Sequence, residues 1–185
     1  MAIAVREAVA SDVEAIYAFI VELATYERGP EQVTGTPELL SEALFGAHPS
    51  AEALIAEDRN ERVGMAVFHG TFSTWECRPG IWLEDLYVPP KHRRAGVGGV
   101  LLAHLARLAV DGGATRLEWN ALSWNTPALR FYEQLGALRL SEWELHRLDG
   151  EALRRVAGGQ PRSSDVSREP VSASGGSTPG QGDPA

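Results

Sequence analysis

Residues 90–105 read PKHRRAGVGGVLLAHL, a basic cluster followed by a glycine-rich turn and an apolar run. Leu101, Leu105 and Leu108 then recur at the spacing of one face of a helix. A strand that leads into a glycine turn and a helix points several unpaired backbone N–H groups at one place, where the helix dipole adds partial positive charge. The stretch is therefore typical of a site for a phosphate group.

Other uses of such a turn can be compared by their spacing. A triphosphate-binding loop requires Lys and then Ser or Thr after its last glycine, whereas Gly98 is followed by Gly99 and Val100. A dinucleotide-binding turn requires Gly or Ala at its sixth position and an acid that ends the next strand, where this chain has Leu101 and Asn120. A turn used only for close packing stays open as an alternative, although the flanking cations favour an anion. These cations are Lys91, His92, Arg93 and Arg94.

The segments before the turn predict helices and then a run of strands. We expect a short strand at residues 3–6 and a helix over residues 11–27, with a capping box of Ser11 and Glu14. The apolar face of that helix comprises Ile16, Phe19, Ile20 and Leu23. A short helix begins at Thr36 and Pro37. Strands are expected at residues 53–58, 62–72 and 80–88, and they form an antiparallel meander.

The segments after the turn complete the predicted fold. The helix that follows the turn ends at residues 111–113, DGG, and a strand follows at residues 115–120. A second helix covers residues 126–136, with Pro127 at its first position and Gly136 as its stop, and residues 143–148, WELHRL, supply a closing strand. The order β-α-α-β-β-β-α-β-α-β predicts an α+β fold, with helices around a mixed, mostly antiparallel sheet.

Composition indicates one domain and a tail. Of the 185 residues, 44% are hydrophobic, which is enough for one core, and we place the domain at residues 1–156. Residues 157–185 are rich in Gly, Pro and Ser and predict a disordered tail. The tail holds two arginines and three acidic residues, so the domain keeps a charge of −7 out of the net −8. This acidity disfavours nucleic acid as a partner and suits a small cationic molecule.

Further classes are disfavoured by what the sequence lacks. It has no apolar run of membrane-spanning length and no signal-peptide pattern, so we expect a cytoplasmic protein without a membrane partner. Cys77 is the single cysteine and the five histidines are scattered, so no metal site is expected.

Two motifs resemble those of a known superfamily. Residues 93–98, RRAGVG, resemble the acetyl-CoA pyrophosphate loop of GNAT acetyltransferases, which is Arg or Gln, two residues, Gly, one residue, then Gly or Ala. Residues 125–137, NTPALRFYEQLGA, match a second motif of that superfamily in order. The matching positions are Asn125, Ala128, Phe131, Tyr132, Gly136 and Ala137.

The resemblance covers nearly all of residues 1–155 and is strongest to the diamine (spermidine/spermine) N-acetyltransferase branch. Besides the two motifs, it rests on VELATYE at 21–27, EQV at 31–33, FGAHP at 45–49 and LEDLYV at 83–88. Ser123 departs from the pattern, because relatives often have an acid before the Trp-Asn pair. The loop at residues 70–80 matches weakly and the tail has no counterpart, so the departures concern the acceptor and not the acetyl donor.

The resemblance implies a GNAT fold, in which a splayed central cleft binds acetyl-CoA and no metal takes part. The pantetheine arm would pair with the backbone of Leu86, Tyr87 and Val88. Glycines at Gly96 and Gly98 would let the pyrophosphate approach the chain closely. The other residues expected to bind acetyl-CoA are Arg93, Arg94, Ala95, Val97, Gly99, Asn125, Ala128 and Tyr132.

Acetylation of an amine requires groups that move protons. An aliphatic amine has a pKa of about 10.4, so a carboxylate must help it to lose a proton. Strand alternation sends Glu84 and Asp85 to opposite faces, and the flanking apolar residues favour Glu84 as the less solvated of the two. The resemblance points to Glu84 as a base acting through water, and to Tyr132 as the acid that protonates the leaving thiolate.

The acceptor site is expected to be acidic and aromatic. The resemblance places acceptor nitrogens near Glu22, Tyr26 and Glu27, with Glu31 close by, and spaced carboxylates suit a long cation. Glu84, Asp85 and Trp124 complete the expected substrate-binding residues. A solvated helix face is the alternative for the glutamates, and core packing is the alternative for Trp124.

We therefore expect an acetyl-CoA-dependent N-acetyltransferase that acts on a primary amine of a small di- or polyamine, or of a lysine-like molecule. The resemblance also implies a homodimer with shared active sites. Acetylation of a protein amine and a non-catalytic acyl-CoA-binding sensor remain alternatives, although the presence of both Glu84 and Tyr132 disfavours the sensor.

Overall fold

The computed structural model describes residues 3–159, which divide into two compact units on either side of the Leu135–Gly136 bond. The first unit contains a five-stranded sheet with the order β1-β2-β3-β4-β5. The strands are β1 (Ala4–Glu7), β2 (Glu52–Asp58), β3 (Glu61–Ser73), β4 (Arg78–Tyr87) and β5 (Leu117–Trp119). The helices of this unit are α1 (Val13–Tyr26), α2 (Pro37–Phe45), α3 (Val97–Asp111) and α4 (Thr126–Gln134), with short 3-10 turns η1 (Ala10–Asp12), η2 (Pro30–Gln32) and η3 (Pro90–His92).

The sheet confirms the predicted mixed topology. Neighbours from β1 to β4 are antiparallel, so the three predicted meander strands correspond to β2, β3 and β4. β5 is parallel to β4, because α3 carries the chain back across the sheet between them. β5 is shorter than the predicted strand at residues 115–120.

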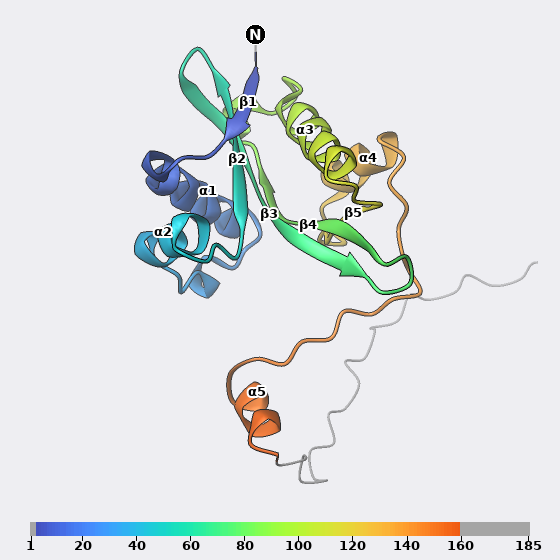
Figure 1. Ribbon diagram of the computed structural model, residues 1–185. Coiled ribbons are helices and arrows are strands. Elements are labelled where there is room, and N and C mark those ends of the chain that lie inside the picture. Colours follow the sequence, from blue (N-terminus) through green and yellow to red (C-terminus); the bar gives the residue numbers. More distant parts are fainter. Residues whose placement is uncertain (1–2, 160–185) are drawn as a thin grey trace, which may run out of the picture. The chain divides into compact units, whose positions relative to one another are not determined.

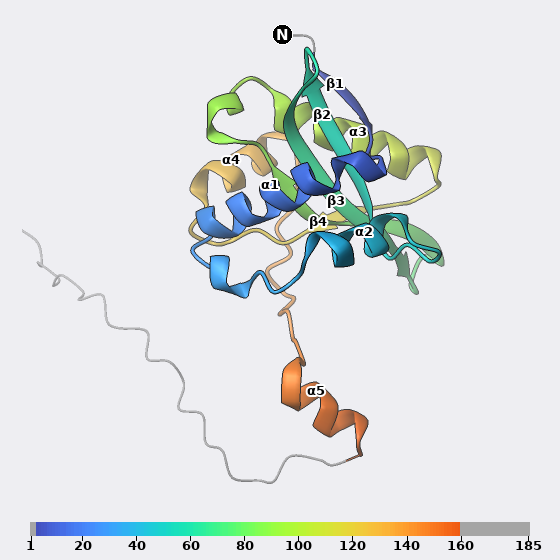
Figure 2. The same ribbon diagram turned by 90° about the vertical axis from the view of Figure 1, so that its left-hand side faces the viewer.

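Helices cover both faces of the sheet. α1 and α2 lie on one face, and α3 and α4 lie on the other (Figures 1 and 2). Consecutive residues of β2 follow this division, since Leu54 packs with the α3 side and Ile55 with the α1 side. Leu101 and Leu105 of α3 are fully buried, as their spacing predicts. A strand buried on both faces is apolar without alternation, which explains the continuous run ALIA at residues 53–56.

A bulge in β4 determines where the sheet opens. Val67 of β3 pairs with Asp85, but the next residue, Phe68, pairs with Leu83, so Glu84 is the extra residue. The parallel pairing of β4 with β5 ends at Leu83 and Trp119. Beyond that pair, the part of the chain that the structure describes offers β4 no second neighbour on this edge. The backbone of residues 84–87 therefore has an edge without a pairing strand, which is where the predicted GNAT fold has its splayed cleft.

The start of α1 differs from the prediction. The expected capping box of Ser11 and Glu14 is wrong, because the turn η1 precedes the helix and Asp12 is the residue before its first turn. The carboxylate of Asp12 accepts a hydrogen bond from the Val9 N–H at 2.9 Å. The Asp12 side chain is completely buried, and Arg6 and Arg62 contact it at 2.6 and 2.8 Å. The acid is thus used to join β1, η1 and β3 rather than to cap α1.

Other predicted helix ends are confirmed in most details. The Thr36 hydroxyl accepts from the Leu39 N–H at 3.3 Å, so it caps α2 as expected. The Asn125 side chain caps α4, and Pro127 stands at the second helical position rather than the first. Gly136 follows the end of α4 with a φ of 81°, a left-handed conformation that favours glycine.

The second unit does not contain the predicted closing strand. Residues 143–148 form no strand, and the regular element in the described part of this unit is the helix α5 (Gly150–Ala157). The prediction took these residues as the last strand of the sheet, but a strand needs a neighbour to bond its backbone groups. The predicted domain boundary at Val156 falls inside α5, and most of the predicted tail, residues 160–185, lies outside the described residues. Within residues 3–159, no helix is both long and apolar enough to cross a bilayer.

Candidate active site

The glycine turn has the geometry expected of an anion site. Gly96 precedes α3 with a φ of 84°, and its carbonyl accepts from the Val100 N–H at 3.1 Å. The N–H groups of the first turn of α3 have no carbonyl of their own helix to bond. A Cβ atom added to Gly96 or Gly99 would meet no atom within 4 Å, and one added to Gly98 would lie 3.8 Å from the Phe131 ring. The protein leaves the space above this turn open, so the turn fits a phosphate group.

Two of the cations before the turn have a structural partner. Lys91 Nζ lies 2.5 Å from Glu61 Oε1, and His92 Nε2 lies 3.3 Å from the same oxygen. The hydrogen bond from Lys91, followed by the positive charge of Lys91, lowers the pKa of the Glu61 carboxyl. These contacts attach the turn to the first residue of β3. Sequence reasoning missed Glu61 because it lies 30 residues away from Lys91 in the chain.

Arg93 lies against aromatic rings. Its Nε donates to the Val88 carbonyl at 3.0 Å, and its guanidinium carbon lies 4.6 Å from the centre of the Tyr26 ring and 5.9 Å from that of Tyr87. This side chain therefore lies beside Tyr26, which we predicted for the acceptor, and Tyr87, which we predicted for acetyl-CoA. Arg94 and Ala95 are exposed in the turn itself, where Arg94 has a φ of 64°.

The end of β4 holds a carboxylate from α1. The buried Tyr87 hydroxyl donates to Glu22 Oε2 at 2.8 Å, and burial, then this hydrogen bond, raises the pKa of Tyr87 to about 12. Glu22 is exposed on α1, and this hydrogen bond from β4 orients its carboxylate. Leu86 and Val88 are half-buried and pack on the α3 side of the sheet.

A hydrogen bond joins the end of α1 to the start of α4. The Tyr26 hydroxyl donates to Asn125 Oδ1 at 3.1 Å, and the same oxygen accepts from the Ala128 N–H at 3.4 Å. The Tyr26 and Trp124 rings lie 5.8 Å apart, and Trp124 remains 44% exposed. Core packing is therefore not the role of Trp124. The hydrogen bond brings Tyr26 and Asn125 together, although they lie 99 residues apart in the chain.

Tyr132 lies in a half-buried aromatic group on α4. Its ring centre is 4.9 Å from that of Trp119 and 5.4 Å from that of Phe131. Burial, followed by the negative charge of Glu27, raises the pKa of the Tyr132 hydroxyl. The phenol therefore keeps its proton and can donate it. Trp119 was not predicted, although its place at the end of the strand before the second motif could have indicated it.

The two acids of β4 differ in burial in the opposite sense to our prediction. Glu84 exposes 54% of its side-chain surface, and its Oε1 lies 3.2 Å from His69 Nε2. Asp85 is half-buried, and its burial, then the charges of Glu27 and Glu84, raise its pKa to about 6. The bulge at Glu84 is the reason, because it changes the face that each following side chain occupies. Simple alternation could not reveal this, and His69 was missed for the same reason.

The charge of Glu27, at the end of α1, thus raises the pKa of both Asp85 on β4 and Tyr132 on α4. Loss of solvent around Glu27 also raises its own pKa. Acids that resist ionisation beside a protonated phenol are common features of sites that move protons. The structure therefore brings together an acid group, an aromatic group and an open anion turn.

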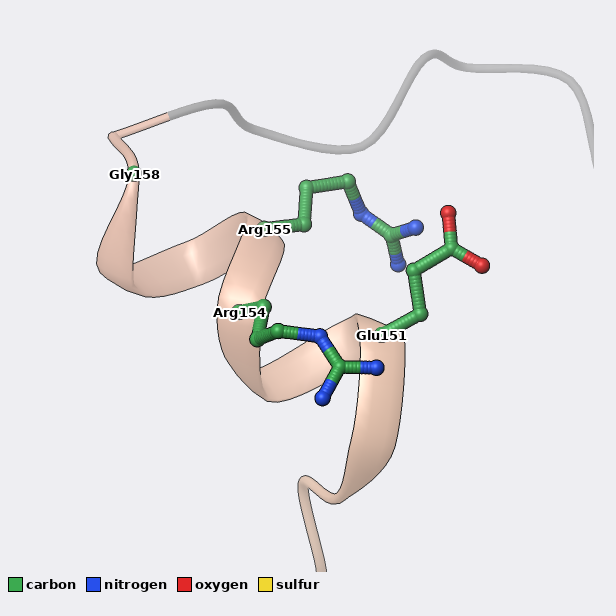
Figure 3. Close-up of a pocket in the computed structure, with 4 residues that line it drawn as sticks. All are labelled: Glu151, Arg154, Arg155 and Gly158. Atoms are coloured by element: carbon green, nitrogen blue, oxygen red, sulfur yellow. The ribbon is translucent and has the colours of Figure 1, made fainter.

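A separate hollow lies on the second unit. It is lined by Glu151, Arg154, Arg155 and Gly158, all from α5 and the residue after it (Figure 3). These side chains belong to successive turns of one short helix, and they include none of the predicted site residues. We assign no function to this hollow.

Comparisons with known proteins agree with this geometry. The acetyltransferase (GNAT) family matches residues 16–137. The thialysine N-epsilon-acetyltransferase of Bos taurus is 36% identical over 165 residues, which cover 83% of this chain and 96% of the relative. The human spermidine/spermine N(1)-acetyltransferase-like protein 1 is 29% identical over 163 residues, which cover 83% of this chain and 23% of that protein.

A solved structure, an integron cassette protein from the mobile metagenome of V. cholerae, superposes with a TM-score of 0.71 at 26% identity. The superposition covers 85% of this chain and 98% of that structure. The chain therefore belongs to the GNAT family of acetyltransferases, which use acetyl-CoA, and it is an N-acetyltransferase.

Proposed function

We propose that this enzyme transfers the acetyl group of acetyl-CoA to a primary amine of a small di- or polyamine, or of a lysine-like molecule. The observation that carries the proposal is the opening between β4 and β5 beyond Leu83 and Trp119. The glycine turn follows one of these strands, and α4, which carries Tyr132, follows the other. The amine classes are those named for the relatives described above.

The donor would be held mainly by backbone groups. N–H groups of residues 94–99 bind the pyrophosphate, and the unpaired edge of β4 at residues 86–88 bonds the amides of the pantetheine arm. Open space at Gly96 and Gly99 supports this assignment, because a phosphate can approach the chain there. Bound acetyl-CoA supplies an activated acyl group as a thioester. The chain's own residues must remove a proton from the amine and return one to sulfur.

Two carboxylates are candidates to accept the proton of the amine. Glu84 would act through water, as the family resemblance implies, and its exposure leaves room for that water. Asp85 lies closer to the protein interior, and its pKa of about 6 is suited to a base that works near neutral pH. Once the amine is neutral, its nitrogen forms the C–N bond and the C–S bond breaks.

Tyr132 would protonate the departing thiolate. A phenol has a pKa near 10 and a thiol one near 8.5, so the thiol holds a proton less tightly than the phenol does. The hydrogen bond from the phenol nevertheless stabilises the thiolate before the proton moves. The raised pKa of Tyr132 supports a protonated donor. Glu22, Tyr26, Glu27, Asp85 and Trp124 would surround the acceptor, with Glu22 held in place by Tyr87.

We further propose a cytoplasmic homodimer with shared active sites. Exposed apolar side chains of the second unit support an interface, since such surface is usually covered. They include Leu138, Leu140 and Leu145. Sedimentation at micromolar concentration should show a dimer, and a monomer with full turnover would contradict the shared site.

An acetyl-CoA turnover assay tests the function. Release of CoA thiol is followed with putrescine, cadaverine, spermidine, spermine, L-lysine, L-thialysine and a histone-type peptide. We expect turnover with at least one small amine and none with the peptide. Peptide acetylation alone would favour a protein acetyltransferase, whereas acetyl-CoA binding without any turnover would favour the sensor.

A further inference from the structure

Arg28 occupies an unusual position beside the acceptor residues. Its guanidinium carbon lies 5.1 Å from the centre of the Trp124 ring, and Trp124 in turn lies against Tyr26. Arg28 is exposed, and within residues 3–159 no carboxylate lies at ion-pair distance from its guanidinium. The same holds for Arg93, whose guanidinium carbon lies 4.6 Å from the centre of the Tyr26 ring. An aromatic face orients each cation, but neither charge is neutralised by the described residues.

The backbone at Arg28 is strained. Its φ is 65°, a left-handed conformation that glycine or asparagine usually supplies at a helix end, although Gly29 follows directly. Any residue other than glycine or asparagine loses on the order of 1 kcal/mol of conformational free energy in this left-handed conformation. The position thus retains a long cationic side chain where glycine would be the more stable choice. This combination suggests that the guanidinium has a use other than stability.

Charges in this region are separated into two groups. Asp85 and Tyr132 are the residues at which the reaction is proposed to occur, and the negative charge of Glu27 acts on both. Arg28 and Trp124 lie at the exposed side, next to Asn125, which caps the first turn of α4. Tyr132 is six residues after Thr126, about 9 Å along the helix axis. A ligand that spans these groups meets negative charge at one end and positive charge at the other.

We propose that Arg28, stacked on Trp124, binds a carboxylate of the acceptor. The acceptor is then an amino acid with a side-chain amine rather than a polyamine. The inference rests on the proposed function and specifies its substrate class. A polyamine carries ammonium groups at both ends, so its distal cation would face the guanidinium and be repelled. An extended lysine-like molecule spans roughly 7 Å between its carboxyl carbon and terminal nitrogen, which is comparable with the separation along α4.

Matched pairs of acceptors isolate the carboxylate. L-Lysine and cadaverine share the reacting amine and chain length and differ in the carboxylate, as do L-ornithine and putrescine. We expect the wild-type enzyme to have a higher kcat/KM for each amino acid than for its decarboxylated counterpart. L-Lysine methyl ester, which keeps the shape but lacks the negative charge, should behave like cadaverine.

Arg28→Gly removes the guanidinium and also relieves the left-handed strain, so it should fold. We expect the KM for L-lysine to rise roughly 10-fold or more, the scale of losing a hydrogen bond to a charged group. The KM for cadaverine should fall, because its distal ammonium is no longer repelled. Arg28→Lys should restore part of the preference for L-lysine. Arg28→Asn, which also tolerates this backbone, provides a second variant without the cation.

Arg59 supplies a matched control, since it is another exposed arginine with a left-handed φ, 51°, in the turn between β2 and β3. Arg59→Gly removes the same charge and should leave both KM values unchanged. Equal or better use of cadaverine by the wild type would overturn the proposal, as would equal changes in both KM values in Arg28→Gly. If the wild type acetylates no amine of either pair, the proposed function itself fails, which is a different result.

Discussion

At the scale of single residues, the site depends on how two ionisable side chains are shielded from water. Asp85 and Tyr132 both have raised pKa values, caused first by burial and then by the charge of Glu27. A carboxylate that resists ionisation and a phenol that keeps its proton are suited to opposite proton transfers. Each can be changed to a residue of similar shape that cannot perform its transfer.

Tyr132→Phe removes the hydroxyl and keeps the ring. The fold should survive, because the ring still packs against Trp119 and Phe131 and the volume hardly changes. We expect kcat to fall roughly 100-fold, the usual scale for a positioned acid, with little change in acetyl-CoA affinity. Single-turnover kinetics measure the chemical step. A variant with wild-type kcat there would leave Tyr132 a packing residue.

Asp85→Asn should make the protein more stable and less active. The folded-state pKa of about 6 lies above the usual aspartate value of 3.8, so the charged form is penalised in the folded state above pH 6. Removing the charge should therefore stabilise the protein at pH 8, by on the order of 1–3 kcal/mol at about 1.4 kcal/mol per pKa unit. The gain should vanish as the pH falls below about 4, where wild-type Asp85 is protonated in both states.

Denaturant titrations at pH 8 and pH 4 measure the stability change, and the pH profile of kcat/KM identifies the base. If Asp85 accepts the proton, the wild-type profile should fall below pH 6, and the variant should lose this limb. If Asp85→Asn still shows the fall in kcat/KM at low pH and Glu84→Gln does not, the base is Glu84. Equal stability of wild type and variant at pH 8 would show that Asp85 is not shielded.

At the scale of elements, the sequence predicted those features whose signals are local. The apolar spacing of residues 101–108 located α3, and the run at residues 53–56 located β2, because both patterns report burial directly. The bulge at Glu84 was missed, since it depends on the register between β3 and β4. The contacts of Glu61 with Lys91 and of Tyr26 with Asn125 were missed because the partners lie 30 and 99 residues apart in the chain. The closing strand at residues 143–148 is wrong, because a local run of residues does not provide a pairing partner.

The glycine turn permits a test at this scale. In Gly98→Val the added Cβ lies at ordinary contact distance from Phe131 and Val88, so the fold should be kept, but the branched side chain crowds the turn whose N–H groups are proposed to bind the pyrophosphate. Millimolar acetyl-CoA should raise the melting temperature of the wild type, as any ligand of the folded state does, and should not raise that of the variant. Gly35→Val, in an exposed loop with no atom within 4 Å of the added Cβ, serves as the control. A full shift in Gly98→Val would show that the pyrophosphate binds elsewhere.

At the scale of the whole molecule, the splayed sheet explains why residues from distant parts of the chain can act together. The glycine turn follows β4, Tyr132 follows β5, and Glu27 follows α1. Gly98 nevertheless lies beside Phe131, the neighbour of Tyr132, and the charge of Glu27 acts on Tyr132. The second motif of the family could be recognised from its letters, but its relation to Glu27 and Asp85 depends on this topology. The choice of acceptor that we propose depends on the charges of Glu27, Asp85 and Arg28, which the two family motifs do not contain.

Detection of the acetylated product tests this account most directly. Wild-type enzyme is incubated with isotope-labelled acetyl-CoA and L-lysine or L-thialysine, and mass spectrometry follows transfer of the label to the side-chain nitrogen. We predict that each CoA thiol released is matched by one labelled product, and that Tyr132→Phe forms product roughly 100-fold more slowly. Absence of labelled product with these acceptors and with the di- and polyamines, from folded enzyme that binds acetyl-CoA, would contradict the account.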